Sequence, residues 1–134
     1  MKPRFTHVAL LVNDVDKTAD FYIQYCGLKV IERRVDPNTG YRVIWLSEEE
    51  GKLNFVIVAF ESKDKPIQSI TKPLSHLGFS LSSREEVNEI AKIAESKGRL
   101  NYGPVYFDTD VGYICAILDP DGNSVEFSFG QKLG

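Results

Sequence analysis

Two stretches of the sequence share one pattern, Phe5-Thr6-His7-Val8-Ala9-Leu10 and Leu74-Ser75-His76-Leu77-Gly78-Phe79. Their histidines are the only two in the chain and stand 69 residues apart, at positions 7 and 76. Each stretch has the short apolar alternation of a β-strand, and each runs into a segment with helical periodicity. The pattern predicts a duplicated unit with one histidine near the start of each copy.

A second strand repeats at the same offset, since Asn54-Phe55-Val56-Ile57-Val58-Ala59-Phe60 aligns with Asn123-Ser124-Val125-Glu126-Phe127-Ser128-Phe129. Helices are expected at about 15–25 and 84–97, opened by capping residues and closed by Gly27 and Gly98. Further strand-like runs complete each copy in the order strand, helix, three strands. The expected strands are 5–12, 28–34, 41–46 and 53–60, then 76–81, about 100–102, 113–118 and 124–129.

Length and composition fit one globular domain. The chain has 134 residues, of which 43% are hydrophobic and 26% charged. A net charge of −3 and a pI near 5.4 give no electrostatic reason to expect nucleic acid or an anionic membrane as partner. No run approaches the roughly 20 apolar residues of a membrane span, and no apolar signal segment follows the first residues, so we expect a cytoplasmic protein. Cys26 and Cys115 lack the spacing of a metal or redox motif, and we interpret both as reduced packing residues.

Strand alternation indicates which way the polar side chains point. Glu126 shares one face of its strand with two serines, whereas the apolar residues between them share the other face, which we expect to be core. By the same logic His76 shares a face with Gly78, and His7 shares one with Ala9. A sheet face with small residues, two histidines and a carboxylate favours a cavity over a packed core.

These residues carry a resemblance that covers nearly the whole chain. The motifs Thr6-His7-Val8-Ala9-Leu10, His76-Leu77-Gly78-Phe79 and Leu118-Asp119-Pro120-Asp121-Gly122-Asn123-Ser124-Val125-Glu126 resemble the vicinal oxygen chelate superfamily. That superfamily includes glyoxalase I, extradiol dioxygenases, fosfomycin resistance proteins, methylmalonyl-CoA epimerase and metal-free bleomycin resistance proteins.

The resemblance implies an α+β fold, in which two tandem βαβββ modules form a cupped eight-stranded mixed sheet with helices on its outer face. Residues 1–134 would be one domain made of two repeats, about 1–62 and 74–130. One divalent ion (Fe²⁺, Mn²⁺, Zn²⁺ or Ni²⁺) would bind in the cup to His7, His76 and Glu126. Tyr113, at the start of a strand expected to face the site, would be a candidate acid or hydrogen-bond donor, although a packing role for it is equally consistent with the sequence. The partners implied are a small molecule and a second copy of the chain.

The fourth ligand position of the family falls by the repeat offset on Ile57, which cannot bind a metal. Glu61 lies four residues further on, about 13 Å by strand rise, too far to replace it. This departure speaks against glyoxalase-type proton transfer by a second carboxylate. Ala9 and the absence of a following arginine speak against the fosfomycin-transferase branch.

The function favoured by the sequence is a metalloenzyme whose substrate chelates the ion through neighbouring oxygens, most of all a dioxygenase-like one, with Glu126 and Tyr113 as catalytic candidates. A glyoxalase-type lyase or isomerase, resembling lactoylglutathione lyase, and a metal-free ligand-sequestering protein stay open as alternatives.

Overall fold

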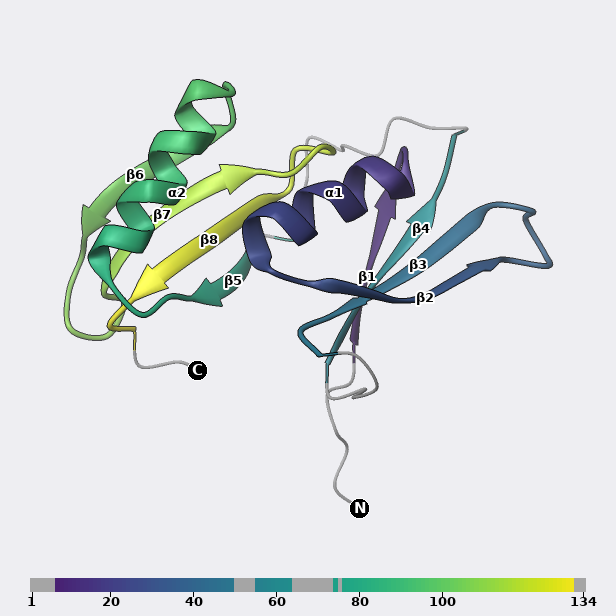
Figure 1. Cartoon of the computed structure of the whole chain (residues 1–134), viewed down its shortest axis with the longest axis horizontal. Helices are drawn as coiled ribbons and strands as arrows, with labels where there is room; N and C mark the ends of the chain where they lie inside the picture. Colours follow the sequence, from purple (N-terminus) through teal and green to yellow (C-terminus); the bar gives the residue numbers. More distant parts are fainter. Residues whose placement is uncertain (1–6, 50–54, 64–73, 75, 132–134) are drawn as a thin grey trace, which may run out of the picture. The chain divides into compact units, whose positions relative to one another are not determined.

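The computed structural model describes residues 7–49, 55–63, 74 and 76–131. The chain divides into two compact units, Met1–Ile70 (unit 1) and Thr71–Gly134 (unit 2). Within the described ranges, each unit has one helix and one four-stranded sheet (Figure 1). The elements of unit 1 are β1 (His7–Val12), α1 (Val15–Cys26), β2 (Lys29–Val35), β3 (Arg42–Ser47) and β4 (Val56–Glu61). Those of unit 2 are β5 (His76–Ser80), α2 (Arg84–Ser96), β6 (Leu100–Tyr106), β7 (Tyr113–Leu118) and β8 (Ser124–Phe129).

The two helices begin where the capping residues predict. The Asp14 carboxylate accepts hydrogen bonds from the backbone N–H groups of Asp16 and Lys17, and the Ser83 hydroxyl accepts one from Glu86 N. At the other end of α1, Gly27 adopts a φ of 65°, in the left-handed region where a side chain would be strained. The sequence positions of both helices are therefore confirmed to within one residue at each end.

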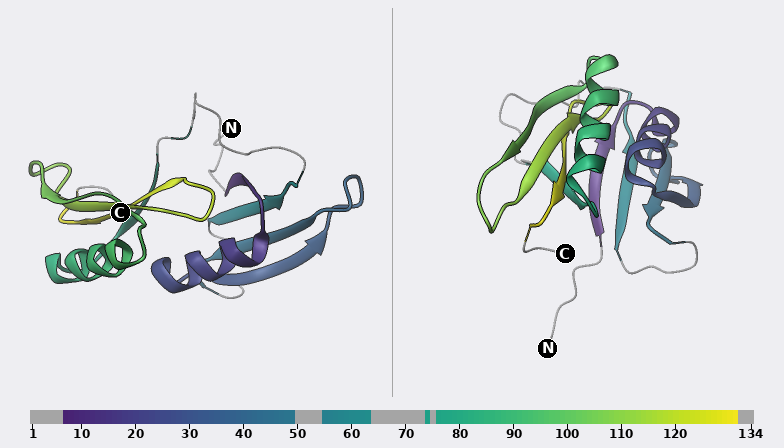
Figure 2. Two further views of the ribbon diagram at one scale, coloured as in Figure 1. Left: turned by 90° about the horizontal axis from the view of Figure 1, so that it is seen from above. Right: turned by 60° about the vertical axis from the view of Figure 1, so that its left-hand side comes forward.

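The two sheets have the same topology. Their strand orders are β1-β4-β3-β2 and β5-β8-β7-β6, in which the first pair of each sheet is parallel and the others are antiparallel. Each helix lies on one side of the sheet of its own unit (Figure 2). We call that side the helix-covered face and the other side the open face. The fold is thus α+β with two tandem βαβββ modules, as the sequence predicts.

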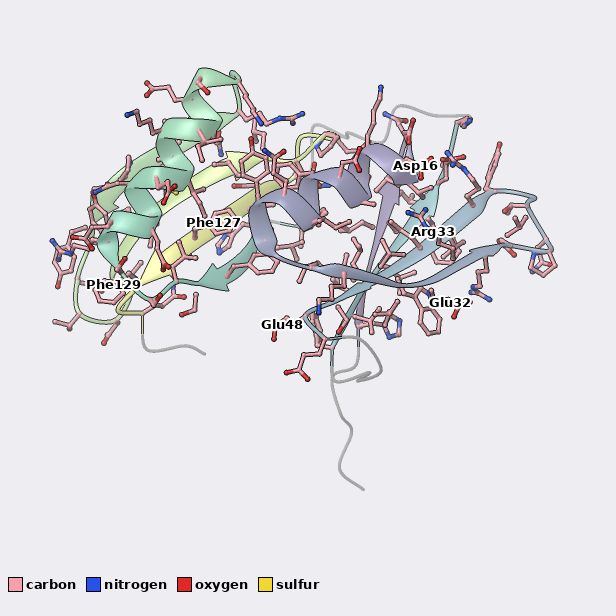
Figure 3. All side chains as sticks on the ribbon, viewed as in Figure 1. Asp16, Glu32, Arg33, Glu48, Phe127 and Phe129 are labelled. Atoms are coloured by element: carbon pink, nitrogen blue, oxygen red, sulfur yellow. The ribbon has the colours of Figure 1, made fainter. Side chains whose placement is uncertain are left out.

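In unit 2 the helix-covered face is apolar. The fully buried Val125 and Phe127 of β8 lie on it, and Phe127 projects between β8 and α2 (Figure 3). The Cys115 thiol contacts the carbonyl oxygen of Val87 in α2 at 3.7 Å, which fixes the face of β7 that the helix covers. Val87, Ala91 and Ala94 are the buried residues of α2. Burial of this face supplies the main driving force for folding of the unit.

The parallel registers of the two sheets differ by one residue. His7 pairs with Val56 in unit 1, whereas His76 pairs with Ser124 in unit 2. Glu126 is paired with Gly78, and the equivalent pair in unit 1 is Ala9 with Val58. The assignment of Ile57 to the fourth ligand position is therefore wrong by one residue. A shift of one residue moves a side chain to the opposite face, and Ile57 lies on the helix-covered face while Val58 lies on the open one.

Within the described ranges, no helix combines the length and the apolar character needed to cross a bilayer. Cys26 is half-buried and Cys115 is buried, and neither is in a disulfide within the described residues.

Candidate functional site

The open face of unit 2 brings together His76 and Glu126. Nε2 of His76 lies 3.7 Å from Oε2 of Glu126, and the two side chains are 46% and 12% exposed. His76 is at the start of β5, two residues before Gly78, so its imidazole reaches Glu126 along the diagonal between the paired strands. A Cβ atom added at Gly78 would meet no atom within 4 Å, so there is open space beside the carboxylate.

The geometry of this pair fits two ligands of one divalent ion. Ligand nitrogen and oxygen atoms each about 2.1 Å from a metal lie roughly 3 to 3.5 Å apart at tetrahedral or octahedral angles. The separation of 3.7 Å between His76 and Glu126 is close to that range. No group of three or more His, Cys, Asp or Glu residues that could hold a metal is assembled within the part of the chain that the structure describes. Unit 2 thus brings together His76 and Glu126, two of the three residues expected as ligands.

Glu126 also has a polar partner from beyond β8. Nε2 of Gln131 donates a hydrogen bond to Oε1 of Glu126 at 3.3 Å, and the Ser128 hydroxyl donates to Oε1 of Gln131 at 3.3 Å. The two carboxylate oxygens of Glu126 therefore have different neighbours, one an amide and the other an imidazole.

His7 opens β1 on the open face of unit 1, where its neighbours are different in character. Val56 is its paired residue, and Val56 packs in a buried cluster with Val43 and Val58. Partly buried hydrophobic residues surround this cluster, namely Ile31, Trp45 and Phe60. The open face of unit 1 is therefore apolar where that of unit 2 is polar.

Glu61 has a structural role on the opposite face of unit 1. It is 4% exposed and accepts hydrogen bonds from Nη2 of Arg42 at 2.6 Å and from Val15 N, at the start of α1, at 3.2 Å. Burial alone would raise the pKa of the Glu61 carboxyl, but the bonds from Arg42 and Val15 outweigh it and lower the pKa. Arg42 also binds Asp16, which in turn pairs with Arg33. Asp16 and Arg33 are labelled in Figure 3. Glu61 and Arg42 are thus held in a charged network at the N-terminus of α1, away from the open face.

Tyr113 points to the helix-covered face, so the structure does not place it in the open face and agrees with its alternative role as a packing residue. Its register partner in β8 is Phe129, which belongs to the helix-covered face. The Tyr113 hydroxyl donates to Oδ1 of Asn88 in α2 at 2.7 Å, and the guanidinium of Arg84 lies over its ring at 5.0 Å. Tyr113 joins the sheet to the helix and takes no part in the open face.

A different tyrosine, not singled out in the sequence, lies on that face. Tyr102 of β6 is paired with Ala116 of β7, and Ala116 is paired with Glu126. The row Tyr102, Ala116, Glu126, Gly78 therefore crosses the open face of the whole sheet. Tyr102 is 44% exposed, and its ring lies 5.9 Å from that of Phe107, which is 51% exposed.

Irregular pairing on both sides of Tyr102 sets its position. The register between β6 and β7 shifts between Leu100 and Tyr102 and again between Tyr102 and Val105, whereas β2 and β3 of unit 1 show a single shift. Bulges change the direction of a side chain and bend the strand. A glycine inside a strand often marks a bulge, so Gly103 is the sequence feature that could have indicated this arrangement. In the structure Gly103 has a φ of 80°, and a Cβ added there would lie 2.6 Å from the carbonyl oxygen of Ile114.

The comparisons with known proteins agree with this architecture. Residues 4–127 match the family model described as the Glyoxalase/Bleomycin resistance protein/Dioxygenase superfamily. An uncharacterized protein of Pseudomonas aeruginosa is 41% identical over 134 residues, which cover 100% of this chain and 94% of that protein. A probable trivalent organoarsenical cleaving enzyme of Bacillus subtilis is 30% identical, with 96% of this chain and 82% of the relative covered. A putative lactoylglutathione lyase of Brassica oleracea is 26% identical over 93% of this chain, which spans 44% of the length of that relative.

Solved structures show the same fold at lower identity. Glyoxalase I of Leishmania major superposes with a TM-score of 0.72 at 17% identity, over 96% of this chain and 88% of that one. The fosfomycin resistance protein FosX of Listeria monocytogenes, in complex with Mn(II), gives a TM-score of 0.72 at 21% identity, over 99% and 96% of the two chains.

Proposed function

Because the chain belongs to the Glyoxalase/Bleomycin resistance protein/Dioxygenase superfamily, we propose that it is a metal-dependent enzyme whose small substrate binds the ion through two neighbouring oxygens. The observation that carries the proposal is the His76–Glu126 pair, 3.7 Å apart beside open space at Gly78. His7 would be the third ligand, supplied by the same chain or by a second copy. The ion, of the set Fe²⁺, Mn²⁺, Zn²⁺ and Ni²⁺, would act as a Lewis acid or as the centre at which oxygen and substrate meet.

Among the reactions of this superfamily, we infer that a dioxygenase-like one fits the residues best. Two imidazoles and one carboxylate are the ligand set of many non-haem Fe(II) oxygenases. The position equivalent to Glu126 in unit 1 is Val58, which is 8% exposed in an apolar cluster. A second carboxylate that could accept a substrate proton is therefore missing from that position.

The row across the open face of unit 2 supports a substrate with a planar ring. Ala116 separates Tyr102 from Glu126, and the two outer residues are two strand spacings apart, about 9.5 Å between backbones. We infer that a six-membered ring would place one edge toward Glu126 and one face against the exposed ring of Tyr102, on either side of the buried Ala116. Exposed aromatic side chains bind such rings by stacking.

A glyoxalase-type lyase is the second candidate, because relatives of this chain carry the name lactoylglutathione lyase. The lyase reaction would require another proton acceptor, because Val58 stands at the position of unit 1 equivalent to Glu126. A metal-free, ligand-sequestering protein is the candidate from outside the enzymes, and the apolar Val58 at the position equivalent to Glu126 is the feature that favours it.

We also propose a homodimer in the cytoplasm, with neither nucleic acid nor membrane as partner. The low net charge of −3 is consistent with both absences. Light scattering of the purified protein at several concentrations would give the oligomeric state directly.

The experiment that tests the proposed function is metal analysis of protein purified without chelators or an affinity metal. Wild type, His7→Ala, His76→Ala and Glu126→Gln would be reconstituted anaerobically with Fe(II), Mn(II) and Zn(II). Glu89→Gln is the matched control, because Glu89 is an exposed carboxylate of the same unit. We expect near one equivalent of metal in wild type and control and a loss in the three other variants. No uptake by wild type would contradict the enzyme proposal and favour the sequestering protein.

The reaction class is tested on the loaded protein. Oxygen consumption with catechol supports the dioxygenase-like reaction, and turnover of the methylglyoxal–thiol adduct without oxygen consumption supports the lyase.

A further inference from the structure

The Glu126 carboxylate is held asymmetrically, and we propose that Gln131 is a positioning residue that makes it bind the metal through one oxygen. This inference rests on the proposed function. Oε1 of Glu126 accepts a hydrogen bond from the Gln131 amide at 3.3 Å, while Oε2 faces the His76 imidazole at 3.7 Å. The oxygen directed to His76 is therefore the one that a shared ion would meet.

A second contact favours one orientation of the Gln131 amide. Ser128 is 2% exposed, and its hydroxyl lies within hydrogen-bond distance of two acceptors, Oε1 of Gln131 at 3.3 Å and the carbonyl oxygen of Phe79 at 3.5 Å. An amide oxygen accepts and an amide NH₂ donates, so donation by Ser128 to the nearer oxygen leaves the NH₂ group toward Glu126. A reversed amide would place its oxygen against the carboxylate, where two acceptors repel.

The backbone after β8 is shaped to bring Gln131 back to Glu126. Gly130 has a φ of 78°, a conformation that side chains disfavour, and it turns the chain directly after Phe129. Gly112 lies against the same turn, since a Cβ added there would be 2.4 Å from the carbonyl oxygen of Phe129 and 2.9 Å from Gln131 N. Gly112 and Gly130 thus allow Gln131 to approach Glu126, which lies five positions earlier in the chain.

Removal of the amide would free Glu126 to rotate. Both oxygens could then turn toward the ion, or the carboxylate could turn away from it. Loss of a hydrogen bond that orients a metal ligand typically lowers metal affinity about 10- to 100-fold. Gln131→Leu keeps the approximate size of the side chain and removes both polar atoms, so it isolates the hydrogen bonds.

The test compares wild type, Gln131→Leu, Gln131→Glu and Ser128→Ala, with Gln24→Leu as the matched control on an exposed position of α1. Mn(II) affinity is measured by titration calorimetry. The infrared spectrum of Zn(II)-loaded protein, labelled with ¹³C-carboxyl glutamate, reports whether a carboxylate binds through one oxygen or two from the separation of its two stretching bands. Thermal unfolding of the metal-free proteins shows whether each variant is folded.

We expect about 10- to 100-fold weaker Mn(II) binding and a narrower band separation in Gln131→Leu, a similar or larger loss of affinity in Gln131→Glu, and a smaller one in Ser128→Ala. Gln24→Leu should match wild type in both measurements. Unchanged affinity and spectrum in a folded Gln131→Leu protein would overturn this inference alone. If wild type binds no metal, this inference and the proposed function both fail.

Discussion

Glu61 could serve either as a metal ligand or as an anchor of α1. Replacement of Glu61 by glutamine distinguishes these two roles. The structure assigns it the second role, through bonds from Arg42 at 2.6 and 3.3 Å and from Val15 N at 3.2 Å. Glutamine keeps one acceptor oxygen, but it removes the charge and presents an NH₂ group to the donors of Arg42. We therefore expect Glu61→Gln to lower the free energy of unfolding and to leave metal uptake unchanged.

The size of the effect follows from the exposure of the partners. A hydrogen bond to a charged group contributes about 1.5 to 3 kcal/mol when it is buried. The side chains of Arg42 and Lys63, which pair with Glu61, are 43% and 64% exposed, so solvent screening reduces this value. We expect a loss of about 1 to 2 kcal/mol, which lowers the midpoint of thermal unfolding by roughly 3 to 8 °C for a chain of this length.

The pH dependence has a defined sign. The pKa of Glu61 in the folded state lies below its ordinary value of 4.5, so the carboxylate stabilises the fold above about that pH. This stabilisation is lost as the pH falls through the folded-state pKa, because the group is then protonated in both states. The difference between wild type and Glu61→Gln should therefore be full at pH 7 and shrink below pH 4.5.

Urea unfolding from pH 3 to 8, followed by circular dichroism, measures this difference. Glu48→Gln is the control, since Glu48 is an exposed carboxylate of the same unit (Figure 3). A Glu61→Gln protein as stable as the control at pH 7 would show that the network does not anchor α1, and one that lost its metal would show that Glu61 is a ligand after all.

Three further predictions concern the register, the open face and the buried thiol. Ile57→Glu should lower the free energy of unfolding by about 3 to 5 kcal/mol with or without metal, because residue 57 lies on the helix-covered face. Val58→Glu should also lower the free energy of unfolding, but Mn(II) should restore part of it, because residue 58 lies on the open face. Equal responses of the two variants to Mn(II) would contradict the register assignment. Tyr102→Ala should weaken catechol binding to the metal-loaded protein roughly 2- to 10-fold without changing oxalate binding, while Tyr106→Ala, whose ring packs on Arg84, should change neither. Burial, and then the charge of Glu126, raise the pKa of Cys115 to about 11, so a chromogenic disulfide reagent at pH 8 should label Cys26 quickly and Cys115 only after unfolding; labelling of both in the native protein would contradict that burial.

The sequence predicts the elements well because their signals are local. The caps at Asp14 and Ser83, the turn at Gly27 and the alternation in β8 each depend on a few neighbouring residues. Duplication of the pattern then gives the order of elements in both units. The joining of the two sheets into one cup and the ligand set His7, His76 and Glu126 remain predictions.

The errors arise where pairing between strands decides the outcome. The sequence aligns Asn54 with Asn123, but the strand pairing of the two units differs by one residue, which exchanges Ile57 for Val58. The sequence leaves open whether Tyr113 faces the site or packs in the core, and its pairing with Phe129 of β8 decides for the helix-covered face. Gln131 had no local signal, because its contact with Glu126 depends on the turn at Gly130.

His76 and Glu126 lie on strands that differ in how firmly the sheet of unit 2 holds them. Glu126 is on β8, which is hydrogen-bonded to a neighbour on each side, whereas His76 begins β5, the terminal strand in the described sheet. Amide hydrogens of inner strands exchange with solvent slowly, and those at strand ends exchange faster. If the two residues bind an ion as proposed, the carboxylate would keep its position more closely than the imidazole, and the imidazole would adjust to ions of different radius. Slower exchange on metal loading should be concentrated in β5.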